Sequence, residues 1–197
     1  NQRDSIDNKY TSFGVEFNVM DTDGKRRKAK VKEDIEFYSV MRSVRAMEYS
    51  DVCILIVDGN RGFDGQVKNI FWLEHRNNKG IVILVNKWDL LDKSTETAKK
   101  AEEQIKSKIA PFTDIPIVFV SALEKQRLLK GLETAIFVHK NRSQKIATSV
   151  LNEVMLPLIE HNPPPATKGK YIQIKYCTQL PTDTPTFVFF ANLPQYI

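Results

Sequence analysis

The hydrophobic and polar positions of the chain repeat with two periods, which predict alternating strands and helices. Continuous apolar runs, typical of strands covered on both faces, occupy residues 52–57, 81–85 and 115–120. Apolar positions with helical spacing occupy residues 33–49, 66–76, 95–109 and 128–139. Strands and helices in this order imply parallel βαβ units with right-handed crossovers. Ligands bind such sheets beyond the carboxyl ends of the strands, so a site is expected there.

The two ends of the chain follow other patterns. Residues 13–20 alternate and are rich in β-branched and aromatic side chains, which predicts a strand, and residues 7–12 can pair with it as an edge strand. After residue 141 the pattern predicts a helix, a proline-rich break and two strands, over residues 143–160, 163–165, 171–178 and 186–191. One helix and two antiparallel strands make a thin core. We therefore expect a larger domain over residues 1–140 and an incomplete module over residues 141–197.

Composition is that of a globular protein with a packed core. Hydrophobic residues make up 42% and charged residues 27% of the 197 positions. The net charge of +5 and the isoelectric point of about 9.1 favour acidic partners such as nucleic acid. Six of the basic residues lie within residues 25–32. This segment is either a solvated loop and helix start or a segment that contacts phosphate.

The apolar runs and the cysteines indicate the cellular setting. The runs 52–57 and 81–85 are far shorter than the roughly 20 residues that cross a bilayer, so no membrane association is expected. Cys53 and Cys177 can form neither a disulfide framework nor a four-ligand zinc site, and reduced thiols in a cytoplasmic protein are expected. The first residues contain neither an initiator Met nor a secretory signal, so we expect the chain to begin inside a longer gene product.

The most specific motif is Asn86-Lys87-Trp88-Asp89, which directly follows the apolar run 81–85. The Asp89 carboxylate can accept from both the imino and the amino group of guanine, whereas adenine offers neither donor there. A site that pairs such donors can reject an analogue lacking them by about 10⁴- to 10⁵-fold. Asn86 would link the loop to the base edge, and the aliphatic stem of Lys87 would cover one face of the purine. A polar turn after a strand is the alternative interpretation.

Two weaker motifs follow other predicted strands. After residues 115–120 comes Ser121-Ala122-Leu123, whose backbone amides could donate to the guanine carbonyl oxygen while Ser121 steadies the Asp89 loop. After residues 13–20 comes an Asp-x-x-Gly segment with Asp21 and Gly24 at its ends. Asp21 could hold Mg²⁺, usually through water, and the Gly24 amide could approach the terminal phosphate closely. Each motif alone is a common turn, but the ordered set is much rarer.

The phosphate-binding motif of such domains does not occur in the sequence. A Gly-x-x-x-x-Gly-Lys-Ser/Thr loop would cradle the α- and β-phosphates. Either the chain begins after that loop, as we expect, or the domain never had it. The predicted fold is α/β: a mostly parallel sheet with helices on both faces, like a P-loop GTPase without its first strand, phosphate loop and first helix, followed by an incomplete α+β domain. No catalytic base is assigned, because Lys25 stands where some GTPases carry a water-orienting residue.

The chain resembles the Der (EngA) GTPases, bacterial proteins with two GTPase domains and a C-terminal KH-like domain. The resemblance rests on residues 3–7, 21–24, 26–28, 31–40, 86–89, 152–153 and 163–165. It covers essentially the whole chain, as the second GTPase domain and part of the KH-like domain. It implies binding of GTP and GDP with Mg²⁺, hydrolysis of GTP, and maturation of the large ribosomal subunit through ribosomal RNA. It also implies contact with an upstream GTPase domain in the parent protein.

Several residues depart from the family pattern. Asn1 and Gln2 stand where the family usually has Thr-Thr, so the hydroxyl expected to reach magnesium is not evident. Asp23 and Lys25 replace an alanine and an aliphatic residue beside the phosphate site, where the extra carboxylate would repel the terminal phosphate or recruit a cation. The KH-like domain would continue after Ile197 with a further helix and strand.

The second domain lacks the Gly-x-x-Gly clamp of KH modules, but Lys168, Lys170 and Lys175 keep it basic. These lysines are either RNA contacts or solvated side chains. For the parent protein we expect a GTPase whose switch segments, residues 3–7 and 21–32, change order with the γ-phosphate, with little or no hydrolysis by this chain alone. The rival hypothesis is a non-catalytic RNA-binding or assembly scaffold with a degenerate nucleotide fold.

Overall fold

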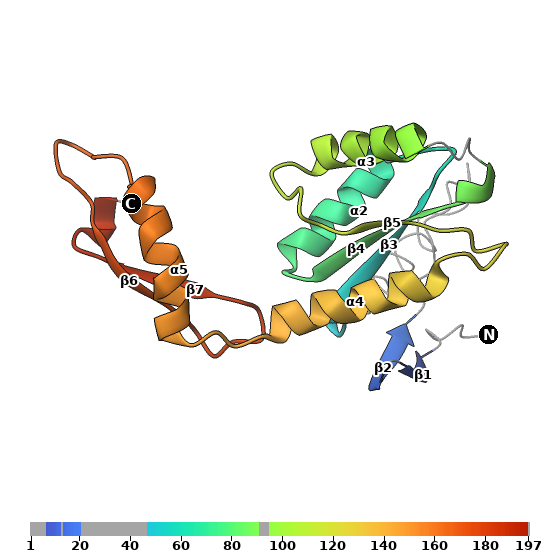
Figure 1. Ribbon diagram of the computed structural model, residues 1–197, viewed down its shortest axis with the longest axis horizontal. Coiled ribbons are helices and arrows are strands. Elements are labelled where there is room, and N and C mark those ends of the chain that lie inside the picture. The colour runs from blue at the N-terminus through green and yellow to red at the C-terminus, as the bar shows by residue number, and fades with distance from the viewer. Residues whose placement is uncertain (1–6, 13, 21–46, 91–94, 197) are drawn as a thin grey trace, which may run out of the picture. The chain divides into compact units, whose positions relative to one another are not determined.

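The computed structural model describes residues 7–12, 14–20, 47–90 and 95–196 (Figure 1). The chain divides into two compact units, residues 1–139 and residues 140–197. Each unit contains a sheet and at least one helix packed against it, and the two are described in turn.

The larger unit is built on a parallel sheet of three described strands. These strands are β3 (Val52–Asp58), β4 (Gly80–Asn86) and β5 (Ile117–Phe119), in the spatial order β3-β4-β5. The register pairs Asp58 with Asn86, so the carboxyl ends of β3 and β4 lie level with each other. The predicted parallel βαβ arrangement is therefore confirmed. The third strand is shorter than predicted because Pro116 has no amide to donate, although its carbonyl still accepts from Ile83 at 2.9 Å.

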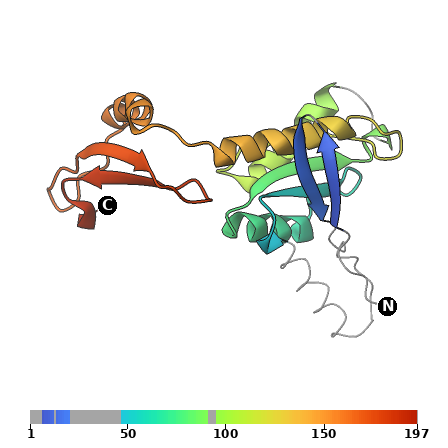
Figure 2. The same ribbon diagram turned by 90° about the horizontal axis from the view of Figure 1, so that it is seen from below.

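Helices cover both faces of this sheet (Figure 1). The helices α2 (Gly65–Arg76) and α3 (Thr95–Ile109) share one face, where Phe71, Ile83 and Ile109 are fully buried. On the other face α4 (Leu128–Ser143) packs on a second cluster that includes Val82 and Leu84. Both views show α4 lying along the strands (Figure 2).

Two glycines allow the backbone of α4 to approach the sheet closely. A Cβ at Gly80 would lie 2.8 Å from Val138 Cγ1, and a Cβ at Gly131 would lie 3.0 Å from Leu84 Cδ2. A side chain at either position would force its neighbour to shift. On the opposite face Asp64 caps α2 by accepting from the amides of Gln66 and Val67 at 3.0 and 2.9 Å.

The beginning of the chain forms a hairpin, as predicted. The strands β1 (Asp7–Ser12) and β2 (Val15–Met20) pair antiparallel in a separate two-stranded sheet. Gly14 makes the turn with a φ of 72°, a conformation that favours glycine. Of the helix predicted over residues 33–49, residues 47 and 48 are helical, and residues 33–46 lie outside the described part of the chain.

The smaller unit consists of α5 (Thr148–His161), β6 (Ile174–Gln179), β7 (Phe187–Ala191) and the 3-10 turn η2 (Pro194–Tyr196). The two strands pair antiparallel. The predicted helix start at residue 143 is wrong: α4 continues to Ser143, and α5 begins at Thr148. The interruption arises because the Ile146 amide donates to Gln179 Oε1 at 2.8 Å and Ala147 has an extended backbone. The proline break after α5 lies where the sequence predicts it.

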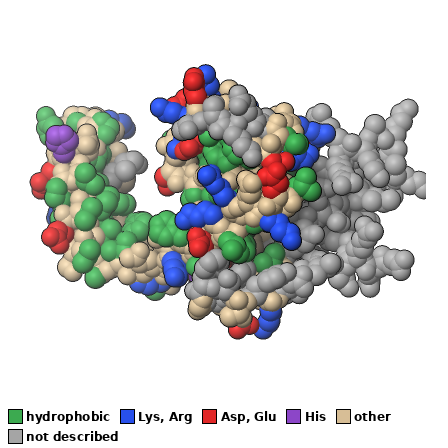
Figure 3. Space-filling view, turned by 45° about the vertical axis from the view of Figure 1, so that its right-hand side comes forward, with side chains coloured by type: hydrophobic (Ala, Val, Ile, Leu, Met, Phe, Trp, Pro, Cys, Tyr) green, Lys and Arg blue, Asp and Glu red, His purple; other side chains and the backbone are tan. Residues whose placement is uncertain are grey.

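Asn152 connects α5 to β6 in the smaller unit. Its amide nitrogen donates to the Cys177 carbonyl at 2.9 Å, and its oxygen accepts from the Cys177 amide at 2.8 Å. Only Leu151, Ile172 and Cys177 are buried among the described hydrophobic residues of this unit. Figure 3 shows many hydrophobic side chains on the surface of the smaller unit.

Within the described residues neither cysteine forms a disulfide bond: Cys177 is buried and Cys53 is half-buried. Among the described residues, no helix is both long and apolar enough to cross a membrane.

Candidate functional site

The loops after β4 and β5 lie side by side at the carboxyl edge of the sheet. The loop after β4 contains the 3-10 turn η1 (Trp88–Leu90), and the Trp88 amide donates to the Val120 carbonyl at 3.2 Å. The Asn86 side chain joins the same two loops, because its Oδ1 accepts from the Ala122 amide at 2.9 Å. The structure therefore brings together two segments that are separated by more than thirty positions in the sequence.

Lys87 connects this edge to β3. Its backbone has a φ of 64°, and its ammonium donates to Asp58 Oδ2 at 2.8 Å. The hydrogen bond from Lys87 is the main cause that lowers the pKa of the Asp58 carboxyl below its ordinary value. Asp58 was not among the predicted site residues. Its position as the last residue of a buried strand, level with Asn86, is the signal that points to it.

Asp89 lies in η1 and is half-buried. Among the described residues, no side chain pairs with its carboxylate by a hydrogen bond or ion pair. A half-buried acceptor that has no partner among the described residues is suited to bind donors from a ligand.

Ser121 is 1% exposed, and its hydroxyl accepts from the Glu124 amide at 3.1 Å. It also forms a pair of backbone hydrogen bonds with Gln126. The serine therefore steadies its own loop, rather than bonding to the described part of the Asp89 loop as expected. Ala122 and Leu123 are exposed, and the Ala122 amide is already bound to Asn86. That amide can donate to a base only if Asn86 shares or releases it.

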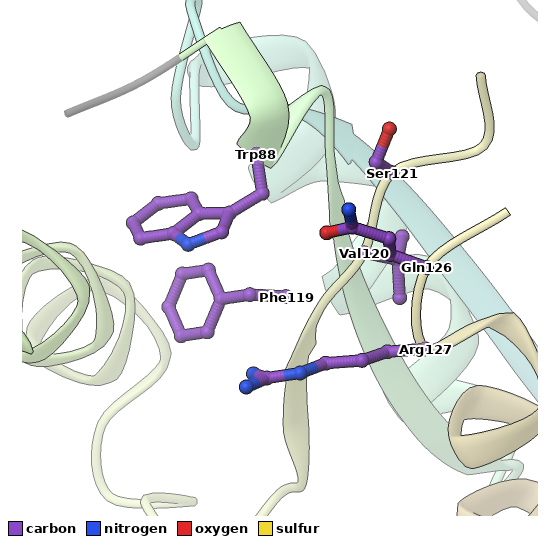
Figure 4. Close-up of a pocket in the computed structure, with 6 residues that line it drawn as sticks. All are labelled: Trp88, Phe119, Val120, Ser121, Gln126 and Arg127. Atoms are coloured by element: carbon purple, nitrogen blue, oxygen red, sulfur yellow. The ribbon is translucent and has the colours of Figure 1, made fainter. Parts of the chain in front are cut away.

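A hollow of about 170 Å³ lies next to these loops (Figure 4). It is lined by Trp88, Phe119, Val120, Ser121, Gln126 and Arg127. The rings of Trp88 and Phe119 lie with their centroids 4.3 Å apart, and the Arg127 side chain extends beneath them. Figure 4 shows the Ser121 hydroxyl pointing away from these rings. Asp89 does not line this hollow, so the hollow is not assigned as the binding site of the guanine base.

The remaining predicted site residues lie in the smaller unit or outside the described residues. Asp21 and Gly24 lie outside them, as do residues 25–32 and the departures at Asn1, Gln2 and Asp23. Within the described part of the chain, no group of three or more His, Cys, Asp or Glu residues could hold a metal ion.

The three lysines predicted to contact RNA are exposed in the smaller unit. Lys170 donates to the Tyr196 hydroxyl at 3.2 Å and lies 4.8 Å from the centroid of its ring. Lys170 is therefore partly engaged within its own unit. Of the other two lysines, Lys168 has a φ of 51°, and Lys175 is at a register shift in β6.

Comparison with protein families identifies the class of both parts. The family of the elongation factor Tu GTP binding domain matches residues 14–161, which is most of the chain. The KH-domain-like family of EngA bacterial GTPase enzymes, C-terminal, matches residues 145–197. The chain is thus a GTP-binding domain of the P-loop GTPase fold followed by a KH-like domain.

The chain belongs to the Der (EngA) family of GTPases. It is 65% identical over 195 residues to GTPase Der of Christiangramia forsetii and of Flavobacterium psychrophilum. It is 60% identical over 197 residues to GTPase Der of Bacteroides fragilis. These matches cover 99% of the chain and 45% of each relative, so the chain spans about half the length of the curated relatives it matches.

Solved structures with a similar fold are GTP-binding proteins. Era in complex with MgGDPNP and nucleotides 1506–1542 of 16S ribosomal RNA has a TM-score of 0.59 at 18% identity, covering 70% of this chain and 45% of that chain. A probable GTP-binding protein engB has a TM-score of 0.56 at 17% identity, and the match covers 72% of this chain and 86% of that chain. At these identities the likeness concerns the fold alone.

Proposed function

We propose that the parent protein binds guanine nucleotides through the loops after β4 and β5 and hydrolyses GTP to GDP. The observation that carries this proposal is the junction of the two loops by the Asn86 side chain, next to a half-buried Asp89 carboxylate without a described partner. Such an acceptor can pair the imino and amino groups of guanine. The Lys87 stem would cover one face of the base, with its ammonium bound to Asp58.

We infer that segments outside the described residues form the phosphate end of the site. We propose that Asp21 holds Mg²⁺ through water and that the Gly24 amide contacts the terminal phosphate. Mg²⁺ would neutralise charge on the phosphates while water attacks the γ-phosphate, so catalysis would be mostly positioning and charge stabilisation.

The edge of β3, unpaired among the described strands, supports the proposal that a phosphate loop lies elsewhere in the parent protein. Among the described strands none pairs with the edge of β3 that faces away from β4, and Ile56 in this strand is 63% exposed. The free edge of an apolar strand exposes unpaired backbone amides and carbonyls, and a further strand would pair them. We propose that the strand leading into the phosphate loop pairs there. Little or no hydrolysis is expected from this chain alone.

For the whole protein we propose a cytoplasmic role in assembly of the large ribosomal subunit, through ribosomal RNA and contact with an upstream GTPase domain. Relatives of about twice this length are named GTPase Der, and a protein of similar fold is titled as a complex with 16S ribosomal RNA. The basic balance of the chain and the exposed Lys168 and Lys175 are compatible with an RNA partner.

Calorimetry on the full-length parent protein tests the nucleotide proposal. Binding of GTP and GDP without binding of ATP is expected. Absence of binding to any of these would favour the rival function, a non-catalytic RNA-binding scaffold.

Replacing Asp89 by Asn tests the assigned base contact. The variant should lose at least about 100-fold in GDP affinity and gain affinity for xanthosine diphosphate, because the amide reverses one hydrogen bond and xanthine supplies the complementary acceptor. The control is Asp114→Asn, at an exposed position outside both loops. Because an upstream GTPase domain is expected in the parent protein, unchanged guanine selectivity at both of its nucleotide sites in the Asp89 variant would refute the assigned role.

A further inference from the structure

The ion pair between Lys87 and Asp58 points to a residue that acts behind the nucleotide site. Asp58 ends β3 and is paired in register with Asn86, which ends β4. Lys87 follows directly and has a φ of 64°, a left-handed conformation that residues with side chains seldom adopt. Such a conformation persists when the surrounding contacts hold it.

Two hydrogen bonds join this turn to the end of β3, and a third orients the Asp58 side chain. The Gly59 amide donates to the Asn86 carbonyl at 2.8 Å. The Asp58 carboxylate uses one oxygen for the Lys87 ammonium at 2.8 Å and the other for the Asn60 amide at 3.0 Å. Because each oxygen has its own partner, the carboxylate is fixed in orientation and forms a prearranged acceptor for the ammonium.

The position of the pair determines what it can do. The side chains of Lys87 and Asp58 are 50% and 29% exposed, so the pair is partly open to solvent. When its ammonium is bound, the stem of Lys87 is fixed at both ends, by the backbone turn and by Asp58. A stem fixed in this way loses little further freedom when a base packs against it.

We propose that Asp58 is a positioning residue for the guanine base, which binds the Lys87 ammonium and thereby holds the Lys87 stem and the turn before Asp89 ready for the nucleotide. This inference rests on the proposed function. The effect belongs to binding and not to cleavage, because the base lies away from the phosphate that reacts. Asp58 itself does not contact the nucleotide in this arrangement.

The test is Asp58→Asn in the full-length parent protein, which removes the charge and keeps the shape. Loss of a partly exposed, charge-assisted hydrogen bond should raise the Kd for GDP at this site about three- to tenfold, while the Kd of the expected upstream GTPase domain, fitted separately, should stay unchanged. The KM for GTP should rise by a similar factor without a fall in kcat. Asp58→Glu, which restores the charge, should recover part of the affinity.

A double-mutant cycle with Lys87→Met separates positioning from a general structural effect. Methionine keeps an apolar stem and removes the ammonium. If Asp58 acts through Lys87, then Asp58→Asn should change the Kd by less than about twofold in the Lys87→Met background. A loss of about threefold or more in that background would overturn the proposal.

The matched control is Asp51→Asn. Asp51 is an exposed aspartate just before β3, at the opposite end of the same strand, and its replacement should leave the Kd for GDP unchanged. If Asp58→Asn does not fold, Lys87→Met alone carries the test with the same expected loss. Wild-type affinity in either folded variant overturns the role of Asp58. Failure of the unsubstituted protein to bind GDP would instead refute the proposed function itself.

Discussion

The two units of the chain bury their hydrophobic side chains to very different degrees. In the larger unit both faces of the sheet are covered by helices, and Phe71, Ile83 and Ile109 are inaccessible to solvent. In the smaller unit Tyr176 is 45% exposed although it stacks on Phe190 with their ring centroids 4.2 Å apart. The comparison teaches that a helix on each face closes a core, whereas one helix beside two strands does not.

The largest expected effect concerns the closed core. Phe71→Ala removes a ring that contacts Phe63 and Trp72, so it should lower the free energy of unfolding by about 3–5 kcal/mol. Tyr176→Ala in the open unit should cost about 1 kcal/mol. Both tryptophans lie in the larger unit, so urea unfolding followed by tryptophan fluorescence reports on that unit. A loss below about 1 kcal/mol for Phe71→Ala would contradict the comparison.

Glu74 is the exception within the well-buried unit. It is 6% exposed, its Oε2 has no hydrogen-bond partner in the described part of the chain, and burial raises its pKa from 4.5 to about 7. At pH values between 4.5 and about 7, Glu74 keeps its proton in the folded protein and releases it in the unfolded chain. Stability should therefore fall as the pH rises from 4.5 to 7, by about 3 kcal/mol from this group.

Glu74→Gln is expected to remove this part of the pH dependence. The measurement is the difference in the free energy of unfolding between the two proteins at several pH values, because other groups cancel in the difference. A difference that stays constant with pH would show that Glu74 does not cause this part of the pH dependence.

A further effect concerns the hydrogen bonds of the open unit. Asn152→Ala leaves the amide and carbonyl of Cys177 without their side-chain partner, so it should cost about 1–3 kcal/mol. Asn141→Ala, at an exposed position in α4, is the matched control and should stay within about 0.5 kcal/mol. Hydrogen exchange of the Cys177 amide is the measurement. Equal protection in the Asn152 variant and the control would show that β6 does not depend on α5 through this contact.

Much of the fold could be predicted from the sequence. The parallel strands β3 and β4 and the helices α2 and α3 begin and end within a residue or two of the predicted positions. Long buried runs and helical periodicity are local signals, and these segments carry them strongly. The boundary between α4 and α5 was missed because it depends on Gln179, which lies more than thirty residues further along the chain.

The candidate site was predictable in its motifs but not in its contacts. The Asn-Lys-x-Asp spacing indicated the loop after β4, and its place at a strand end followed from the apolar run before it. The bond of Ser121 to Glu124 and the occupied Ala122 amide were not predicted. Each depends on how a loop closes on itself or on its neighbour, which residue types alone do not specify.

The sequence by itself therefore determined the order of strands and helices and the motif that indicates a guanine nucleotide. The tertiary structure alone decided that Asp58 binds Lys87, that Asn86 binds Ala122, and that Glu74 is buried with no partner for Oε2 among the described residues. The physical reason is that periodicity and spacing are properties of neighbouring residues. The pairs Asp58–Lys87 and Asn86–Ala122 join residues far apart in the chain, and they form only because parallel strands bring their carboxyl ends level at one edge.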